Sequence, residues 1–330
     1  MFLLSGRWHV SYTNLERVCF SRLSSGGISI DRTSALSLLI LGAFIFFTSQ
    51  IKAGASTVDP SHISLDVSVY DRQGRPVQDL SQKDFEVFED KKTQPVTLLR
   101  FERGSPISLG ILIDISRGMG RENIGLVLDW VKSLAEKLKS PDEIFLNAFS
   151  NEPQEVVDFI SPEDYLEEPL NHLGTGGPSH TGLAVDLALI KLREAKNKKR
   201  ALLLVSPGFD RAGPATLDHV ARFRYPIYAV GLRGAVGITG ALDRLKSLNV
   251  RGSALKVYAD QSGGNALFVQ SSKELEHTLD TLIFELKNQY RLEYGSSNPK
   301  RDGKLRKVEV KVRNCDCEVR YLKKYQAPRL

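Results

Sequence analysis

Ser108-Leu-Gly-Ile-Leu-Ile-Asp114-Ile-Ser116-Arg-Gly118-Met119 is the stretch that decides the fold. An apolar run with the length and composition of a buried strand ends in the carboxylate of Asp114, and a hydroxyl follows at Ser116. An acid and a hydroxyl on the loop that leaves a buried strand form an oxygen-rich site, which hard divalent cations favour. The stretch therefore predicts a central strand and a ligand site at its carboxyl end.

Downstream of this strand, strand and helix patterns alternate as far as residue 290. Apolar residues spaced three and four apart predict a helix from Ile124 to Leu138 and a closing helix from Leu275 to Leu286. The other predicted elements are strands at 143–149, 155–160, 201–205, 225–231 and 266–269 and a helix at 181–195. This alternation predicts an α/β fold, with a doubly wound, mostly parallel sheet.

The segments on either side of this region show the period-two alternation of antiparallel strands. Residues 62–102 predict a small antiparallel sheet with a turn at Asp71-Arg-Gln-Gly74. Near the other end, Asp302-Gly303 predicts a hairpin turn, and the valines of 307–313 alternate with charged residues. We expect these flanking segments to form a small second β domain.

The chain therefore divides into four predicted parts. They are a signal peptide or N-terminal membrane anchor at 1–55, an N-terminal β segment at 56–104, the doubly wound domain at 105–290, and a C-terminal β segment at 291–330 that packs with the N-terminal one.

Composition and charge exclude one class of function. The 330 residues are 42% hydrophobic and 25% charged, which is ordinary for a globular protein. The formal net charge is +6, but residues 1–55 hold five basic and two acidic residues, which leaves 40 basic and 37 acidic residues elsewhere. Because this body is nearly balanced, we expect no nucleic-acid partner.

The N-terminal part predicts export. Arg22 and Arg32 precede the apolar block 35–47, and the small-x-small pattern of a cleavage site follows at Ala53-Gly-Ala55. Cleavage there leaves a chain that begins near Ser56. The alternative is an uncleaved membrane anchor, since residues 33–51 are uncharged and just long enough to span a bilayer. In either case we expect the protein outside the cytoplasm: periplasmic, secreted or anchored in the membrane.

The cysteines do not suggest a disulfide framework. Cys19 lies in the segment that cleavage would remove, and Cys315 and Cys317 are two residues apart in a strand pattern. A bridge between such close neighbours would be strained, so we expect two strand residues without a redox role.

Three loops are expected to meet at the carboxyl end of the sheet, where ligands bind in open parallel sheets. The first carries Asp114 and Ser116, and the second runs through Gly174-Thr-Gly-Gly-Pro-Ser-His-Thr181 into a helix. The third, Ser206-Pro207-Gly208-Phe209-Asp210, follows the strand 201–205.

Motifs in order along the chain support a family resemblance. They are Asp71-x-x-Gly74-x-Pro76-Val77-x-Asp79-Leu80, Asp84-Phe85-x-Val87-x-Glu89-Asp90, Tyr290-x-Leu-x-Tyr294, Asp302-Gly303-Lys304 and Lys324-Tyr325-x-Ala-Pro328. With these flanks, residues 62–328 resemble the bacterial exported VWFA-related family, and residues 107–290 resemble its von Willebrand factor type A domain.

The resemblance implies a metal-ion-dependent adhesion site, built from Asp-x-Ser-x-Ser, a threonine on the second loop and an aspartate on the third. Asp114, Ser116 and Thr181 match this pattern. Gly118 stands where the second serine is usual and Pro207 where the aspartate is usual, and Asp210 is the nearest carboxylate that could replace the latter. We therefore expect a degenerate site, where Mg²⁺ or Mn²⁺ binds weakly or not at all.

The residues around this site suggest a ligand surface. Fixed positive charge at Arg117 and Arg121 opposes a bound cation and favours an acidic residue of a protein ligand. With Gly118 and His180, they are the predicted ligand contacts.

The resemblance implies a non-enzymatic protein-binding or adhesion module, whose ligand the sequence does not identify. A structural cell-envelope component without a metal or ligand site is the alternative. A hydrolase on the doubly wound sheet is less expected: the glycines at 174–177 lack a Walker lysine, and Ser206 lacks the first glycine of a nucleophile elbow.

Overall fold

The computed structural model describes residues 62–164, 176–208, 210, 212–232 and 253–329. All of them belong to one compact unit, Val58–Leu330. The predicted signal or anchor and its apolar span at 33–51 lie outside the described residues. Among the helices that are described, none combines the length and the apolar character needed to cross a membrane.

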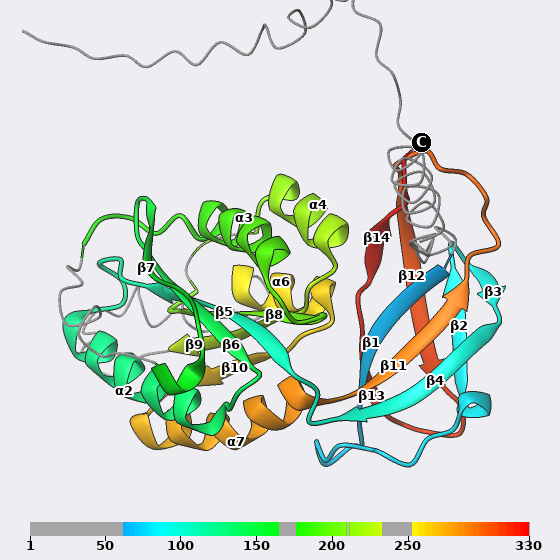
Figure 1. Cartoon of the computed structure of the whole chain (residues 1–330), viewed down its shortest axis with the longest axis horizontal. Helices are drawn as coiled ribbons and strands as arrows, with labels where there is room; N and C mark the ends of the chain where they lie inside the picture. The colour runs from blue at the N-terminus through cyan, green and yellow to red at the C-terminus, as the bar shows by residue number, and fades with distance from the viewer. Residues whose placement is uncertain (1–61, 165–175, 209, 211, 233–252, 330) are drawn as a thin grey trace, which may run out of the picture. The chain divides into compact units, whose positions relative to one another are not determined.

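A six-stranded sheet forms the centre of the α/β domain (Figure 1). Its strands, in spatial order, are β10 (Ala266–Val269), β9 (Ile227–Leu232), β8 (Lys199–Ser206), β5 (Ile107–Asp114), β6 (Glu143–Phe149) and β7 (Pro153–Ile160). All neighbours are parallel except β7, which runs antiparallel to β6. The predicted fold class, a doubly wound and mostly parallel sheet, is confirmed.

Helices cover both faces of this sheet (Figure 1). One face packs against α2 (Arg121–Lys137) and α7 (Ser272–Lys287), and the other against α3 (Thr181–Lys191), α4 (Pro214–Phe223) and α6 (Ala254–Ser262). Every residue of β5 is therefore buried, with Ile111 and Leu112 pointing into opposite cores. Coverage on both sides explains why this strand is continuously apolar in sequence.

The flanking segments form the second, β domain. One antiparallel sheet has the order β13 (Glu318–Arg320), β1 (His62–Tyr70), β11 (Asn288–Gly295) and β4 (Val96–Arg103). The other has the order β14 (Lys324–Gln326), β12 (Leu305–Val312), β2 (Phe85–Glu89) and β3 (Lys92–Gln94). A single hydrophobic core contains buried residues from both sheets.

Strand pairing in this domain differs from the sequence-based expectation. The strands of residues 62–102 do not form a sheet of their own, because β1 and β4 both pair with β11 whereas β2 pairs with β12. The hairpin predicted at Asp302-Gly303 is also wrong: β11 and β12 belong to different sheets. Since β11 already has a neighbour on each side, the chain must cross to the other sheet to continue.

The cysteine pair differs as well. Cys315 and Cys317 form a disulfide, with their Cα atoms 5.2 Å apart. They lie in the connection between β12 and β13 rather than in a strand, and Asn314 just before them has a positive φ of 52°. The prediction of two unbridged strand residues is wrong because this turn lets neighbouring side chains converge.

Two glycines test the packing of the α/β domain. A Cβ at Gly264 would lie 2.1 Å from the backbone oxygen of Ile227, whereas a Cβ at Gly125, on the exposed side of α2, meets nothing within 4 Å. We expect Gly264→Ala to lower the free energy of unfolding by about 1–3 kcal/mol, as overpacking does. The matched change Gly125→Ala should raise it by about 0.5–1 kcal/mol, because alanine favours a helix. Urea unfolding of both variants measures the difference, and equal effects would contradict this packing.

Candidate functional site

Three loops meet at the carboxyl ends of β5, β6 and β8. The backbone N–H of Ile115 donates to the carbonyl of Phe149 at the end of β6 (2.8 Å). Gly176 and Arg117 then join the first loop to the loop before α3: Gly176 donates to Ile115 (3.0 Å), and Arg117 donates to Gly177 (3.1 Å). These backbone bonds fix the loop that carries Ser116 against the loop that carries His180.

The Asp114 carboxylate lies at the centre of this junction with no exposed surface. Its Oδ1 accepts a hydrogen bond from the backbone N–H of Ser116 (2.8 Å). Its Oδ2 accepts from the hydroxyls of Ser206 (2.7 Å) and Ser179 (3.0 Å). Donors from all three loops therefore converge on one carboxylate.

Burial and hydrogen bonding act on this carboxylate in opposite directions. Burial raises the pKa of Asp114 and is the larger effect; hydrogen bonds from Ser116, Ser206 and Ser179 lower it. Burial therefore opposes the charged form of Asp114 more strongly than these neutral donors stabilise it.

Thr181 and Asp210 form a second layer of the site. The Thr181 hydroxyl donates to Oδ2 of Asp210 (2.8 Å), and the Thr181 backbone N–H donates to the same oxygen (3.0 Å). Asp210 therefore binds a free N–H at the start of α3, where a negative charge is favourable. Thr181 Oγ1 lies 3.2 Å from Ser179 Oγ, so Ser179 connects this layer to Asp114.

The structure brings the four predicted metal ligands together as two contacting pairs, which Ser179 connects. Asp114 and Ser116 are in direct contact, as their motif implied. Thr181 and Asp210 reach Asp114 only through Ser179. Asp210 Oδ2 caps α3 in this structure, and its suggested role as a replacement for the carboxylate missing at Pro207 stays a prediction.

Sequence reasoning missed two residues that bind Asp114, namely Ser179 and Ser206. A signal for Ser206 was available: it ends β8 just as Asp114 ends β5, and these strands are parallel neighbours in register. Ser179 stands two residues before Thr181 on the same glycine-rich loop, so the loop was identified correctly but its nearest hydroxyl was not.

The predicted ligand contacts surround the buried carboxylate. Arg117, Gly118, Arg121 and His180 are all exposed. Neither arginine forms an ion pair with a carboxylate in the part of the chain that the structure describes. Gly118 and Pro207 have no side-chain oxygen. The site therefore lacks the hydroxyl and the carboxylate that the family pattern places at these two positions.

The side chains at this site have the oxygen donors that a hard cation prefers, but there are few of them. The described residues hold no group of three or more His, Cys, Asp or Glu side chains placed to share a metal ion. Asp114, Ser116, Ser179 and Thr181 instead offer one carboxylate and three hydroxyls, and oxygen donors of this type suit Mg²⁺ or Mn²⁺.

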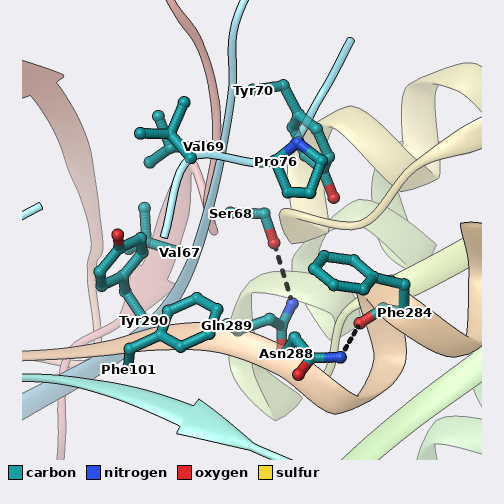
Figure 2. A pocket seen from close by; sticks show the side chains of 11 residues that line it. Val67, Ser68, Val69, Tyr70, Pro76, Phe101, Phe284, Asn288, Gln289 and Tyr290 are labelled. Atoms are coloured by element: carbon teal, nitrogen blue, oxygen red, sulfur yellow. Dashed lines mark hydrogen bonds between the residues drawn. The ribbon is translucent and has the colours of Figure 1, made fainter. Parts of the chain in front are cut away.

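A small pocket lies elsewhere, between β1, β11 and the end of α7 (Figure 2). It is partly open to solvent, and most of the residues that line it are apolar, including Phe101, Phe284 and Tyr290. Gln289, one of its polar lining residues, donates to Ser68 (3.3 Å) and to the Tyr228 hydroxyl (2.9 Å). It contains none of the residues around Asp114.

A comparison with protein families identifies the α/β domain. Residues 109–280 match the model of the von Willebrand factor type A domain, and the chain belongs to this family. The resemblance noted in the sequence is confirmed. A comparison with curated proteins found no match.

Several solved structures are similar to this chain at low identity. BatB from Bacteroides thetaiotaomicron is 13% identical, with a TM-score of 0.44, over 55% of this chain and 98% of that one. A von Willebrand factor type A protein from Catenulispora acidiphila is 10% identical, with a TM-score of 0.44, over 73% and 75% of the two chains. The vWF domain of the type V pili tip protein Mfa5 from Porphyromonas gingivalis is 13% identical, with a TM-score of 0.40, over 54% and 94%.

The hydrogen bonds to Asp114 predict a difference between two substitutions. Asp114→Ala leaves the buried N–H of Ser116 and two hydroxyls without their acceptor, so we expect it to cost about 2–4 kcal/mol of unfolding free energy. Asp114→Asn keeps an oxygen acceptor and removes a charge that burial disfavours, so its cost should stay within about 1 kcal/mol. Denaturant unfolding of the two variants decides; equal losses would show that these hydrogen bonds do not stabilise the site.

Proposed function

We propose that this chain is a protein-binding module that acts outside the cytoplasm and contacts its ligand at the face around Asp114. One observation carries the proposal: at the carboxyl edge of the sheet, a buried carboxylate accepts hydrogen bonds from two hydroxyls. The chain that follows it carries Arg117 and Arg121, which are exposed and form no ion pair with the described residues. Type A domains generally act as interaction modules, which agrees with this reading. The fixed positive charge favours a ligand that presents an acidic residue.

A divalent cation is the second part of this proposal. Asp114, Ser116 and Ser179 would hold Mg²⁺ or Mn²⁺, with Thr181 adjacent, and the side-chain oxygens absent at Gly118 and Pro207 would make the affinity low. When bound, such an ion supplies an open coordination position for a carboxylate of the partner. Arg117 and Arg121 attract the same carboxylate without a metal.

A hydrolase is the weaker alternative. The Ser206 hydroxyl donates to Asp114, and the Ser179 hydroxyl does the same. In the described part of the chain, no histidine is hydrogen-bonded to either hydroxyl, so the pairing of nucleophile and base that hydrolysis needs is not formed there. A structural envelope component without a ligand is the remaining alternative, and the experiment below separates it.

Metal binding is tested by calorimetric titration of the full chain in detergent with Mg²⁺ and Mn²⁺. We expect weak, saturable binding that Asp114→Asn abolishes and Ser179→Ala weakens about tenfold, since the first removes the negative charge of the site and the second removes a hydroxyl ligand. Ser133→Ala is the control and should change nothing, because Ser133 is a half-buried serine on α2 whose hydroxyl donates to the Asp129 carbonyl. Binding that survives Asp114→Asn would place the cation elsewhere.

Ligand capture is tested with the same full-length protein as bait in the presence and absence of EDTA. Capture that Asp114→Asn and the double change Arg117→Glu with Arg121→Glu both leave intact would contradict the proposed face. Capture that EDTA does not affect but the arginine changes abolish would assign recognition to the arginines alone.

Export is tested by the mass of the mature protein. From Arg22, Arg32 and the Ala53-Gly-Ala55 pattern, we propose cleavage and expect a new N-terminus near Ser56. An intact chain in the membrane fraction would instead assign residues 33–51 as an anchor. An intact chain recovered from the cytoplasm would contradict export altogether.

A further inference from the structure

The outer face of α3 is apolar along its whole length. Leu183, Leu187 and Ile190 are 46%, 44% and 44% exposed, and their spacing of four and three residues places them in one row. Leu305 on β12, at 40%, is the other large hydrophobic residue that is exposed in the described part of the chain. Three of the four therefore lie on one helix, and we call them the α3 stripe.

Both charged residues on α3 face a side chain of a neighbouring element. The helix carries two charged residues, Asp186 and Lys191. Asp186 Oδ1 lies 2.9 Å from Nδ1 of His219 on α4, and Lys191 pairs with Asp158 (2.6 Å) and Glu155 on β7. A surface helix normally turns charged residues outward, so this helix has the pattern of an element that another chain covers.

The stripe begins at the proposed ligand site. Thr181 is the first residue of α3, and its hydroxyl lies 3.2 Å from that of Ser179, which binds Asp114. The loop before α3 is hydrogen-bonded to the backbone of Arg117. A molecule seated on the stripe therefore meets the loop of the exposed Arg117 at the N-terminal end of α3. Along the rest of the helix it meets an acid that faces His219 and a lysine that two acids hold.

We propose that the α3 stripe docks an amphipathic segment of a partner protein, with apolar side chains on α3 and an acidic residue toward Arg117 and Arg121. This inference rests on the proposed function and specifies its partner. From Leu183 to Ile190 the helix rises about 10 Å, which two turns of a partner helix can match. Three half-exposed side chains fall far short of the roughly 800 Å² per partner of a stable dimer, which argues against a second copy of this chain.

Selection from a random library of twelve-residue phage-displayed peptides on the immobilised full chain in detergent tests the proposal. We expect enriched peptides to combine an Asp or Glu with apolar residues at helical spacing. Affinities of the enriched peptides, made synthetically, are then measured against variants of the full chain.

Leu187→Asp should weaken these peptides at least about tenfold, because it puts a charge into the apolar contact. Leu187→Ser is the milder second variant, with loss in the same direction. Leu305→Asp makes the same change at an equally exposed leucine on β12 and should have no effect. Arg117→Glu should weaken acidic peptides several-fold and restore peptides whose acidic residue is replaced by Lys.

Several results would overturn the inference. They are enriched peptides that bind Leu187→Asp as well as the unchanged protein, peptides without an acidic residue, and a dimer in light scattering that Leu187→Asp dissociates. The site and the stripe are distinguishable: Asp114→Asn tests the proposed site and Leu187→Asp the stripe. If only Leu187→Asp lowers the affinity for the peptides, docking on α3 is supported and recognition at Asp114 is contradicted. If only Asp114→Asn lowers it, recognition at Asp114 is supported and docking on α3 is contradicted.

Discussion

The arrangement of the site depends on the solvation of one carboxylate. Asp114 ends a strand that is buried on both faces, so water cannot stabilise its charge and the chain must supply the hydrogen bonds. Ser116, Ser179 and Ser206 come from three different loops and meet that need together. The same contacts hold the loop that leads into α3. They also fix the backbone of the loop that carries the exposed Arg117.

The α/β domain was largely predictable from sequence because its signals are local. A strand between two helix layers is buried on both faces and favours a long apolar run, and β5, β6 and β8 each contain one. The β domain was predictable in kind but not in pairing. Period-two alternation shows that β1, β2 and β12 are strands with one buried face, yet it cannot show that β1 pairs with β11, more than two hundred residues away.

The site was predictable to the level of its loops. Motif and topology placed Asp114 and Ser116 correctly and identified the two other loops. Whether Ser179 or Thr181 contacts Asp114 depends on the conformation of their loop, in which Gly176 and Gly177 have positive φ angles. The order of the hydroxyl residues in the sequence does not determine that conformation. The role of Asp210 also escaped prediction, because an acid can either face a ligand or cap a helix, and both are compatible with its position.

The α/β domain is inserted between two strands that are themselves a pair. Its chain enters from β4 and leaves from α7 directly into β11, and Arg103 and Asn288 are opposite each other in the ladder; the Gly104 N–H also donates to the Lys287 carbonyl. Backbone hydrogen bonds therefore hold the first and last residues of the α/β domain next to each other. A pulling force on the α/β domain would therefore act on this antiparallel ladder, where many backbone hydrogen bonds share the load.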